Sequence, residues 1–363
     1  MKAFNEVFED RTKYGTKLKT DEYKEQGTHL IIDQGQKLIA GYTDLSDGLF
    51  EDIPAIIFGD HTRIVKYVED PFFIGADGVK ILKSRIKDAN YKYLYYALKY
   101  VKIPNTGYNR HFKWLKKVKI KYPDLIEQQK IVKILDGVEE IIVGQTEQIK
   151  KLDDLIKARF VEMFGTLQDN QYGYKIVTIE AVCSMIKDGT HQTPIYTENT
   201  ETGYKFLSSK DVMTQKIDWT NIKYISSDLH EKLYATIKPQ RNDILMSKNG
   251  VNYGVAAVND TDEIFDIYVS LALLRPTEVI NPVYLRCVIN SPDTKRQFAK
   301  SIKGIGVPNL HLGEIRKTKI LLPSLARQNQ FAAFVHQVDK SKFSILDIPV
   351  INKTSCRFLI QGI

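Results

Sequence analysis

Histidine and cysteine are the side chains of this sequence that most often bind metal ions or take part in catalysis. The seven histidines are widely spaced, and no pair has the HxxxH or HExxH spacing of a zinc site. The three cysteines, Cys183, Cys287 and Cys356, form no CxxC pair and no even set. This disfavours a zinc cluster and a disulfide framework, and it fits a protein of the reducing cytoplasm.

Other catalytic motifs are missing or incomplete. The chain has no Gly-rich phosphate loop with a Walker lysine and no G-x-S-x-G nucleophile turn. Residues 70–73, DPFF, are similar to the D/N-P-P-Y/F loop of amino-methyltransferases, but they lack its second proline and an accompanying Gly-rich S-adenosylmethionine loop. Residues 292–295, PDTK, lack the second acid of a nuclease metal site and are better explained as a helix-capping turn. The sequence therefore predicts no catalytic residues, no metal site and no cofactor in this chain.

The composition is that of a folded protein with a basic surface. Of the 363 residues, 43% are hydrophobic and 26% are charged, which is typical of globular chains of one or two domains. A net charge of +8 favours a polyanionic partner such as nucleic acid, although charge alone is equally compatible with no such partner. No apolar run approaches the roughly 18 residues that span a bilayer, and no signal-peptide core is present, so we expect no membrane association.

A repeat with an offset of 200 residues divides the chain. Laid together without a gap, the two copies stay in register over about 30 residues, which makes coincidence a poor explanation. The residues of the first copy that recur unchanged in the second are Asn109, His111, Lys117, Lys119, Ile120, Pro123, Leu125, Gln128 and Val138.

Both copies predict the same local structure. In the first, lysines alternate with apolar residues over 117–122, as in a half-buried strand that a proline then ends. Asp124 and Glu127 follow with the spacing of a helix capping box. In the second copy Ser324 takes the N-cap position, but Arg327 replaces the acid and leaves the box incomplete.

The helix of the first copy is predicted to be long. Apolar residues recur every three or four positions from Ile131 to Met163, interrupted by Gln145 and Arg159, and Gly165 is a natural stop. Such a helix extends about 60 Å at 1.5 Å per residue. A single apolar stripe requires a partner, and the helix of the second copy is the obvious candidate.

The sequence thus predicts an α+β protein with a pseudo-twofold internal repeat, in which long antiparallel coiled-coil helices join two mixed α/β domains. We expect the first domain at residues 1–122, a spacer helix at 123–165, the second domain at 166–322 and a second spacer helix at 323–363. This last helix is expected to be degenerate or truncated after about residue 344, where the heptad pattern is lost and Pro349 interrupts it.

This arrangement resembles the specificity (S) subunits of type I restriction–modification systems. Those proteins carry two target-recognition domains separated by two helical regions, each opened by a proline lead and an E-Q-x-x-I phrase, here at 123–131 and, degraded, at 323–331. Phrases typical of two different classes of recognition domain occur at residues 34–44 and 58–82 and at residues 187–196 and 241–258. The resemblance covers nearly the whole chain and is specific as a combination.

The resemblance implies a DNA-binding, non-catalytic subunit of a cytoplasmic complex. It implies recognition of a bipartite, asymmetric sequence in double-stranded DNA and a helical platform for methyltransferase (M) subunits, with restriction (R) subunits joining through them. S-adenosylmethionine and ATP with Mg²⁺ would then serve those partners and not this chain.

Candidate DNA contacts follow from side-chain chemistry. Phosphate contacts are expected from Lys113, Lys117 and Lys119 in the first domain, and from Lys187, Arg241, Lys248 and Lys317 in the second. Base contacts are expected from loop residues Thr62 and Arg63, and from Thr190, His191, Gln192, Asn249 and Asn252. For each of them the alternative is ordinary turn chemistry or a solvated strand edge.

Two alternatives to the leading interpretation stay open. The chain could be a decayed or phase-varied specificity subunit that binds DNA without assembling a full complex. It could also be a fragment of a single-chain restriction–methylation enzyme, but that enzyme needs a catalytic domain for which no residues are left over.

Overall fold

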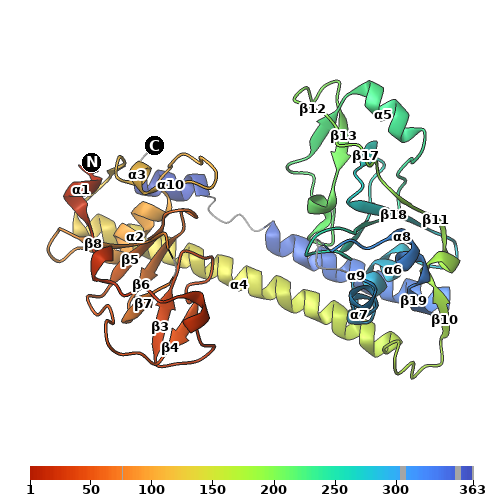
Figure 1. The fold of residues 1–363 in the computed structure, drawn as a ribbon, viewed down its shortest axis with the longest axis horizontal. Coiled ribbons are helices and arrows are strands. Elements are labelled where there is room, and N and C mark those ends of the chain that lie inside the picture. Colours follow the sequence, from red (N-terminus) through yellow and green to blue (C-terminus); the bar gives the residue numbers. More distant parts are fainter. Residues whose placement is uncertain (76, 303–307, 348–352, 362–363) are drawn as a thin grey trace. The chain divides into compact units, whose positions relative to one another are not determined.

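The computed structural model describes residues 1–75, 77–302, 308–347 and 353–361. The chain divides into two compact units, which we call unit 1 (Met1–Glu147 with Leu346–Ile363) and unit 2 (Gln148–Ile345). Both units combine small β-sheets with helices, which confirms the predicted α+β class (Figure 1).

Unit 1 contains two principal sheets. The first is antiparallel, with the order β2 (Phe8–Asp10), β8 (Val79–Ser84), β5 (Ala55–Gly59) and β6 (Val65–Val68). The second has the order β4 (Gly41–Thr43), β3 (His29–Ile32) and β7 (Phe72–Ile74), with β3 and β7 parallel. Strands β5 and β6 are neighbours in the chain and pair as an antiparallel hairpin.

Unit 2 repeats this topology. Its first sheet has the order β11 (Cys183–Asp188), β18 (Leu271–Pro276), β15 (Ile244–Ser247) and β16 (Ala256–Val258), again antiparallel. Its second has the order β12 (Tyr196–Thr197), β14 (Lys223–Ile225), β13 (Tyr204–Leu207) and β17 (Phe265–Ile267), with β13 and β17 parallel. The repeat therefore extends through both sheets, far beyond the residues in which the sequence displays it.

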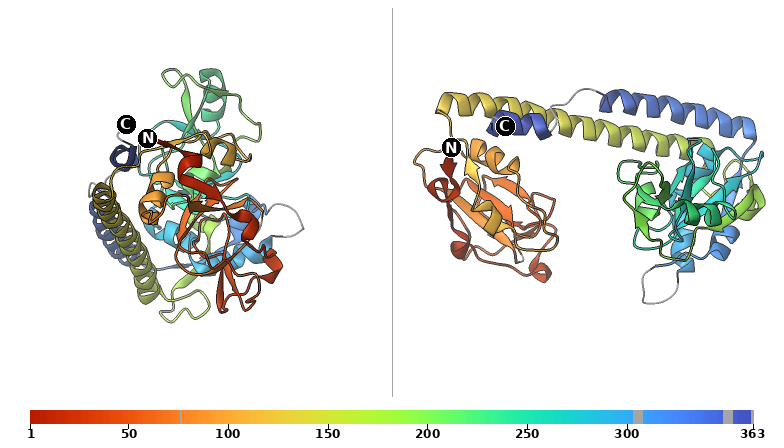
Figure 2. Two further views of the ribbon diagram at one scale, coloured as in Figure 1. Left: turned by 90° about the vertical axis from the view of Figure 1, so that its left-hand side faces the viewer. Right: turned by 90° about the horizontal axis from the view of Figure 1, so that it is seen from above.

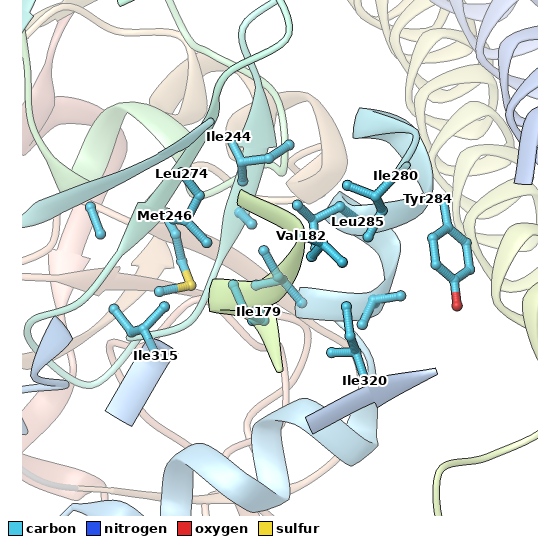
Figure 3. Packing of buried hydrophobic residues seen from close by; sticks show 14 of the residues in the cluster. Ile179, Val182, Ile244, Met246, Leu274, Ile280, Tyr284, Leu285, Ile315 and Ile320 are labelled. Atoms are coloured by element: carbon cyan, nitrogen blue, oxygen red, sulfur yellow. The ribbon is translucent and has the colours of Figure 1, made fainter. Parts of the chain in front are cut away.

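The middle strands are buried on both faces. In β5, Ile56 and Phe58 belong to one core cluster, while Ala55 and Ile57 belong to another on the opposite face. In β15, Ile244, Met246 and Leu245 divide between two clusters in the same way, and Figure 3 shows the cluster that contains Ile244 and Met246. A strand that is buried on both faces reads as a continuous apolar run instead of an alternating one.

Helices at equivalent positions cover these sheets. Helix α2 (Tyr91–Lys99) begins at Asn90 and α6 (Pro282–Ile289) begins at Asn281, and each asparagine side chain accepts a hydrogen bond from the first turn. The remaining short elements of the two units are α1 (Phe4–Val7), α3 (Phe112–Leu115), α5 (Ser227–Tyr234), α7 (Pro292–Ser301), α8 (Leu312–Lys317) and the 3₁₀ turns Thr12–Tyr14, Thr20–Glu22, Ile179–Val182 and Ser209–Val212.

The predicted strand over residues 117–122 is mostly wrong. Only β9 (Lys119–Ile120) is a strand, and it pairs with β1 (Lys2–Ala3). Phe112 and Leu115 are both buried, and their separation of three residues suits the helical turn α3, which places Lys117 in the turn that follows it. The second copy forms the longer pair of β10 (Lys175–Thr178) with β19 (Lys319–Leu322).

Equivalent glutamines in the two copies hold the segment that precedes each long helix. Gln128 Nε2 donates to the Pro123 carbonyl at 2.8 Å, and Gln328 Nε2 donates to the Pro323 carbonyl at 2.9 Å. Both glutamines are buried, so each needs this partner. The hydrogen bond explains why a proline and a glutamine five residues apart recur in the two copies.

Helix α4 (Leu125–Phe164) is a continuous helix of 40 residues. The Asp124 side chain accepts a hydrogen bond from the Glu127 N–H at 2.8 Å, as predicted for an N-cap. Gly165, which has φ of +71°, follows the last turn and donates to the Val161 carbonyl at 2.7 Å.

In unit 2, α9 (Leu325–Leu346) packs antiparallel to the last part of α4 (Figures 1 and 2). The Phe331 ring lies 5.5 Å from the Phe160 ring and 5.4 Å from the Phe164 ring. Further along, the buried Lys342 ammonium bonds Asp153 at 2.6 Å. Residue numbers increase along α9 while those of the contacting residues on α4 decrease. This confirms that the two helices run antiparallel here.

The C-terminal segment contains a helix that the sequence did not suggest. Pro349 lies outside the described residues, and beyond it α10 (Lys353–Gln361) joins unit 1. Cys356 and Ile360, one turn apart, are buried in the cluster that contains Leu135 of α4. Arg357 Nε donates to the Tyr100 carbonyl at 3.0 Å. Part of the α4 stripe in unit 1 is thus covered by the end of the chain.

Phe331→Ala tests the helix pair. The ring is fully buried between α4 and the sheet core of unit 2, so its loss should lower the free energy of unfolding by about 3–5 kcal/mol. Phe343→Ala on the same helix, where the side chain is 68% exposed, should cost about 0.5 kcal/mol or less. Urea denaturation followed by Trp219 fluorescence measures both, and similar losses for the two variants would contradict this packing.

Candidate nucleic-acid interface

In unit 1 the turn between β5 and β6 meets two other loops. The Asp60 N–H donates to the Gly78 carbonyl at 2.6 Å, and the His111 N–H donates to the Asp60 carbonyl at 2.8 Å. Thr62 Oγ1 donates to the Gln34 carbonyl at 2.7 Å. We call residues 34, 60–63, 77–78 and 108–111 the first corner.

Two buried side chains fix the first corner. Asp60 is 3% exposed, and its carboxylate accepts a hydrogen bond from the Phe112 N–H at 2.6 Å, at the start of α3. His111 is fully buried, with Nδ1 3.0 Å from the Asp60 carbonyl oxygen. A buried carboxylate that lost these partners would be costly, so the turn and the start of α3 are held together.

Unit 2 has the same backbone junction. The Lys248 N–H donates to the Ser270 carbonyl at 2.9 Å, and the Leu310 N–H donates to the Lys248 carbonyl at 2.8 Å. The Gly250 N–H adds a bond to the Pro308 carbonyl at 2.9 Å. Strand register makes Lys248 and Asn249 equivalent to Asp60 and His61. We call residues 188–192, 248–252, 270 and 308–310 the second corner.

Lys248 has a structural partner and is not a free cation. It is 5% exposed, and its ammonium bonds the Asp188 carboxylate at 2.8 Å. A buried lysine that is already paired would have to leave its carboxylate uncompensated before it could reach a phosphate. Burial and this ion pair disfavour Lys248 as a phosphate contact, contrary to what its residue type suggested.

The other predicted base-reading residues of unit 2 gather in the second corner. Thr190 is fixed by its N–H bond to the Ile267 carbonyl at 3.1 Å, and its hydroxyl accepts from the Gln192 N–H at 3.2 Å. The His191 side chain is 75% exposed and lies 3.4 Å from Asp188. Asn252 is exposed in the β15–β16 loop. The His191 and Asn252 side chains are thus open to solvent on a backbone that hydrogen bonds hold in place.

His61 and Asn249 occupy equivalent positions in the two corners, and within the described part of the chain the side chain of each contains a buried polar atom without a partner. His61 Nδ1 and Asn249 Oδ1 are both buried without a hydrogen-bond partner among the described residues. Such atoms are rare in folded proteins, and they often mark a place where a ligand or an ordered water supplies the missing bond. Sequence reasoning proposed Asn249 but missed His61.

Thr62 and Arg63 complete the turn of the first corner. The Thr62 hydroxyl is already used in the hydrogen bond to the Gln34 carbonyl, so this side chain stabilises the shape of the turn. Arg63 adopts φ of +62°, and its guanidinium forms no ion pair with any described residue. Of the two predicted readers, Arg63 is the one whose side chain stays available.

The lysines of the first unit form an unneutralised strip next to the first corner. From Arg110 to Lys121 the sequence holds six cations and no acid. Lys113, Lys117 and Lys119 are exposed, and none is ion-paired within the described part of the chain. The Lys113 and Lys117 ammonium groups lie 5.5 and 5.0 Å from the centre of the Trp114 ring. This is the strongest candidate for phosphate contact in unit 1.

Three predicted phosphate contacts of unit 2 lie outside the second corner. Arg241 precedes β15, at the strand end opposite the corner, and it pairs with Asp262 at 2.7 Å, which lowers the pKa of that carboxyl. Lys187 is exposed on β11, with its ammonium 3.4 Å from the Thr236 carbonyl. Lys317 is exposed at the end of α8. Lys187 and Lys317 keep accessible charge, whereas Arg241 has a salt-bridge partner.

Two further residues of the first corner escaped the sequence analysis. Tyr108 is 88% exposed and stacks on His61, with ring centres 4.8 Å apart and an interplanar angle of 11°. Arg110 is exposed and lies near Asp77, whose pKa is lowered mainly by the hydrogen bond from Lys17 and further by the charges of Arg110 and His61. The sequence feature that could have indicated this site is an aromatic residue, Tyr108, two positions before Arg110 in a loop that contains glycine.

In residues 1–75, 77–302, 308–347 and 353–361 no three His, Cys, Asp or Glu side chains are grouped so as to hold a metal ion. Within those same ranges, no helix has both the length and the apolar character needed to span a bilayer.

A family model described as the type I restriction modification DNA specificity domain matches residues 1–153 and 172–348. The chain belongs to this family. The two matched ranges lie largely in units 1 and 2, so this specificity subunit has two recognition domains. The repeat seen in the sequence is the repeat of that domain.

Individual relatives agree. Over 296 residues the chain is 24% identical to the type I restriction enzyme MjaVIII specificity subunit of Methanocaldococcus jannaschii, covering 74% of this chain and 69% of the relative. Over 155 residues it is 30% identical to the EcoR124I/EcoR124II specificity subunit of Escherichia coli, covering 39% and 38%. The solved S subunit of the M. genitalium type I system shares the fold, with a TM-score of 0.54 at 15% identity over 100% of this chain and 96% of its own.

Lys248→Ala separates the structural lysine from the accessible ones. Removing the ammonium leaves Asp188 without its charged partner, so the free energy of unfolding should fall by about 1–3 kcal/mol. Lys317→Ala, which removes an exposed lysine of the same unit, should change stability by less than about 0.5 kcal/mol. Urea denaturation of both variants tests this, and an unchanged midpoint for Lys248→Ala would contradict the assigned pairing.

Proposed function

We propose that this specificity subunit binds a bipartite, asymmetric sequence in double-stranded DNA, with one half-site read by each unit. The observation that carries the proposal is the pair of corners. They share their backbone hydrogen bonds but present different side chains, for example His61 and Arg63 in one and Asn249 and Asn252 in the other. A common frame with different polar groups is what two readers of different sequences require.

Phosphate binding is assigned to exposed lysines outside the reading positions. Lys113, Lys117 and Lys119 adjoin the first corner, and Lys187 and Lys317 belong to unit 2. Lysine contributes charge without geometric selectivity, so these side chains would raise affinity for all duplexes alike. Arg63, His191, Gln192 and the two asparagines of the second corner would carry sequence preference.

Helix α4 is proposed to set the distance between the half-sites. Its 40 residues extend about 60 Å at 1.5 Å per residue, which lies between one and two turns of B-DNA. The base pairs between the half-sites would then be unread. The pairing of α9 with α4 in unit 2 supports a stiff element.

Catalysis is proposed to belong to partner subunits. The exposed faces of α4 and α9 offer a platform for M subunits, which would methylate adenine with S-adenosylmethionine, and R subunits using ATP and Mg²⁺ would join through them. The absence of a phosphate loop, a nucleophile turn or a complete methyltransferase motif in the sequence supports this division. A complex of this kind would act on DNA in the cytoplasm.

Two rival functions remain testable. A decayed subunit would bind DNA and fail to co-purify with an M subunit. A fragment of a single-chain enzyme would transfer methyl groups from labelled S-adenosylmethionine to DNA without any partner. Methyl transfer by the purified chain alone would overturn the proposed division of labour.

Selection from a random duplex pool tests the proposed function. The full-length chain should enrich a split motif whose two halves differ and whose middle is unconstrained. Enrichment of one contiguous motif, or of no motif, would refute it.

Lys117→Ala tests the assignment of phosphate contacts. The variant should bind every duplex more weakly, with the slope of log affinity against log salt smaller by about one, and with an unchanged motif. Lys24→Ala is the matched control, because Lys24 is already paired with Asp44 at 2.8 Å in the same unit. A changed motif at constant overall affinity would place Lys117 among the base readers instead.

His191→Ala tests the assignment of base contacts. The preference should change within one half-site only, because the residue belongs to the second corner, while the salt slope stays the same. Selection with the variant, compared base by base with the parent motif, provides the measurement. A loss of preference in both halves would show that the two units do not read separately.

A further inference from the structure

Within the part of the chain that the structure describes, three large hydrophobic side chains are far more exposed than the others. Among the described large hydrophobic residues, Ile195 is 90% exposed, Tyr108 88% and Val251 85%, and the next, Phe343, is 68%. Tyr108 belongs to the first corner and Val251 to the second, and Ile195 follows three residues after Gln192. Single exposed hydrophobic residues are common, but the three extremes here all lie at the proposed reading loops.

The Tyr108 ring is fixed in place although it is exposed. One face stacks on His61, as described above, and the other face is open to solvent. The loop is tied by the Asn109 N–H bond to the Gly107 carbonyl at 2.9 Å and by the Asn109 side chain, which donates to the Thr106 carbonyl. A ring that is fixed beforehand loses little conformational freedom when its open face meets a partner.

Val251 occupies a comparable position in unit 2. It lies at the tip of the β15–β16 loop, after Gly250, which has φ of +84° and donates to the Pro308 carbonyl at 2.9 Å. The Tyr253 N–H donates back to the Gly250 carbonyl at 3.3 Å and closes the turn. The side chain is thereby held out beside Asn249 and Asn252, both proposed base readers.

Charge at the first corner indicates what Tyr108 meets. Arg63 and Arg110 are not ion-paired within the described residues, and the lysine strip begins on α3 at Lys113, three residues after Arg110. An aromatic ring in a loop with unpaired cations nearby in the corner is suited to a polyanion with flat apolar surfaces inside, which describes duplex DNA. A protein partner would more often cover a contiguous apolar patch, which the isolated ring does not provide.

We propose that Tyr108 and Val251 are wedges, each of which inserts at one base step of its half-site and partly unstacks it. This inference rests on the proposed DNA-binding function. Apolar wedges beside cations are a general means of deforming a duplex so that more protein surface reaches it. Because pyrimidine–purine steps unstack most easily, each wedge adds preference for such a step at a position that no hydrogen bond reads.

The side-chain chemistry of the two wedges differs. Tyr108 offers a planar ring that stacks on an exposed base, and His61 supports it from behind. Val251 has an aliphatic side chain without a ring. It can separate two neighbouring base pairs, but it cannot replace the stacking that they lose. The first half-site should therefore depend more strongly on its wedge than the second.

The experiment uses the full-length chain, the split motif from random-pool selection, and duplexes carrying 2-aminopurine at successive positions of each half-site. 2-Aminopurine brightens when it is unstacked. The wild-type chain should raise its fluorescence at one step in each half-site. Tyr108→Ala should abolish the signal in the first half only, weaken binding on the order of tenfold and relax preference at that step. Tyr108→Phe should keep the fluorescence signal, the affinity and the base preference of the wild-type chain, because the aromatic ring and not the hydroxyl group inserts.

Matched variants separate the wedge from general effects. Val251→Ser should abolish the signal in the second half only. Tyr14→Ala removes another exposed tyrosine of unit 1, one that lies against Arg11 and Lys13, and it should change neither signal nor motif. Circular dichroism of each variant confirms that it is folded, since both wedges are exposed and their loss removes no core contact.

Each other outcome is decisive. If the wild-type chain selects a split motif but brightens no 2-aminopurine, the wedges are wrong and the proposed function stands. If uracil in place of thymine weakens binding as much as Tyr108→Ala does, and no base brightens, Tyr108 contacts a thymine methyl group and inserts nowhere. If the wild-type chain selects no split motif, the proposed function fails and the wedges fail with it.

Discussion

The interaction on which the two recognition units depend is a single backbone hydrogen bond in each corner. The carbonyls of Asp60 and Lys248 accept it from the segments that precede α3 and α8. It joins the turn of a buried hairpin to a loop more than 50 residues away in sequence, and the loop leads directly into the lysine-bearing helix. The loops and lysines that we propose to contact DNA are thereby built on one rigid point, in the way that functional loops usually depend on a scaffold.

The same junction is stabilised by opposite charges in the two units. Asp60 is buried and satisfied by a backbone N–H, whereas Lys248 is buried and satisfied by a carboxylate. Burying either charge without its partner would cost several kcal/mol, so each unit has acquired its own compensating group. The fold therefore constrains the backbone of the corner and leaves the chemistry of its side chains free to differ between the two units.

Local patterns in the sequence predicted local structure well. Asp124, the apolar stripe and Gly165 located α4 because caps and helical periodicity are readable within a few residues. The rest of the fold depends on distant pairing: β3 lies parallel to β7 some 40 residues later, through strands of three or four residues that carry little periodicity. Helix α10 was missed because the spacing of Cys356 and Ile360 has meaning only beside the core that they fill.

The candidate site was only partly predictable for the same reason. Exposed lysines and loop asparagines can be proposed from residue type, and Lys113, Lys117, His191 and Asn252 are indeed accessible. The pairing of Lys248 with Asp188, 60 residues away, cannot be read from either segment alone. The stack of Tyr108 on His61 likewise appears only when the loop and the turn are brought together.

The central claim is that two unlike corners on a common frame read two unlike half-sites. Methylome sequencing of a host that expresses this chain with an M subunit tests it most directly. The account predicts methylated adenines within a split motif of two different halves separated by a fixed, unread spacer. A contiguous motif, or a split motif with identical halves, would contradict it.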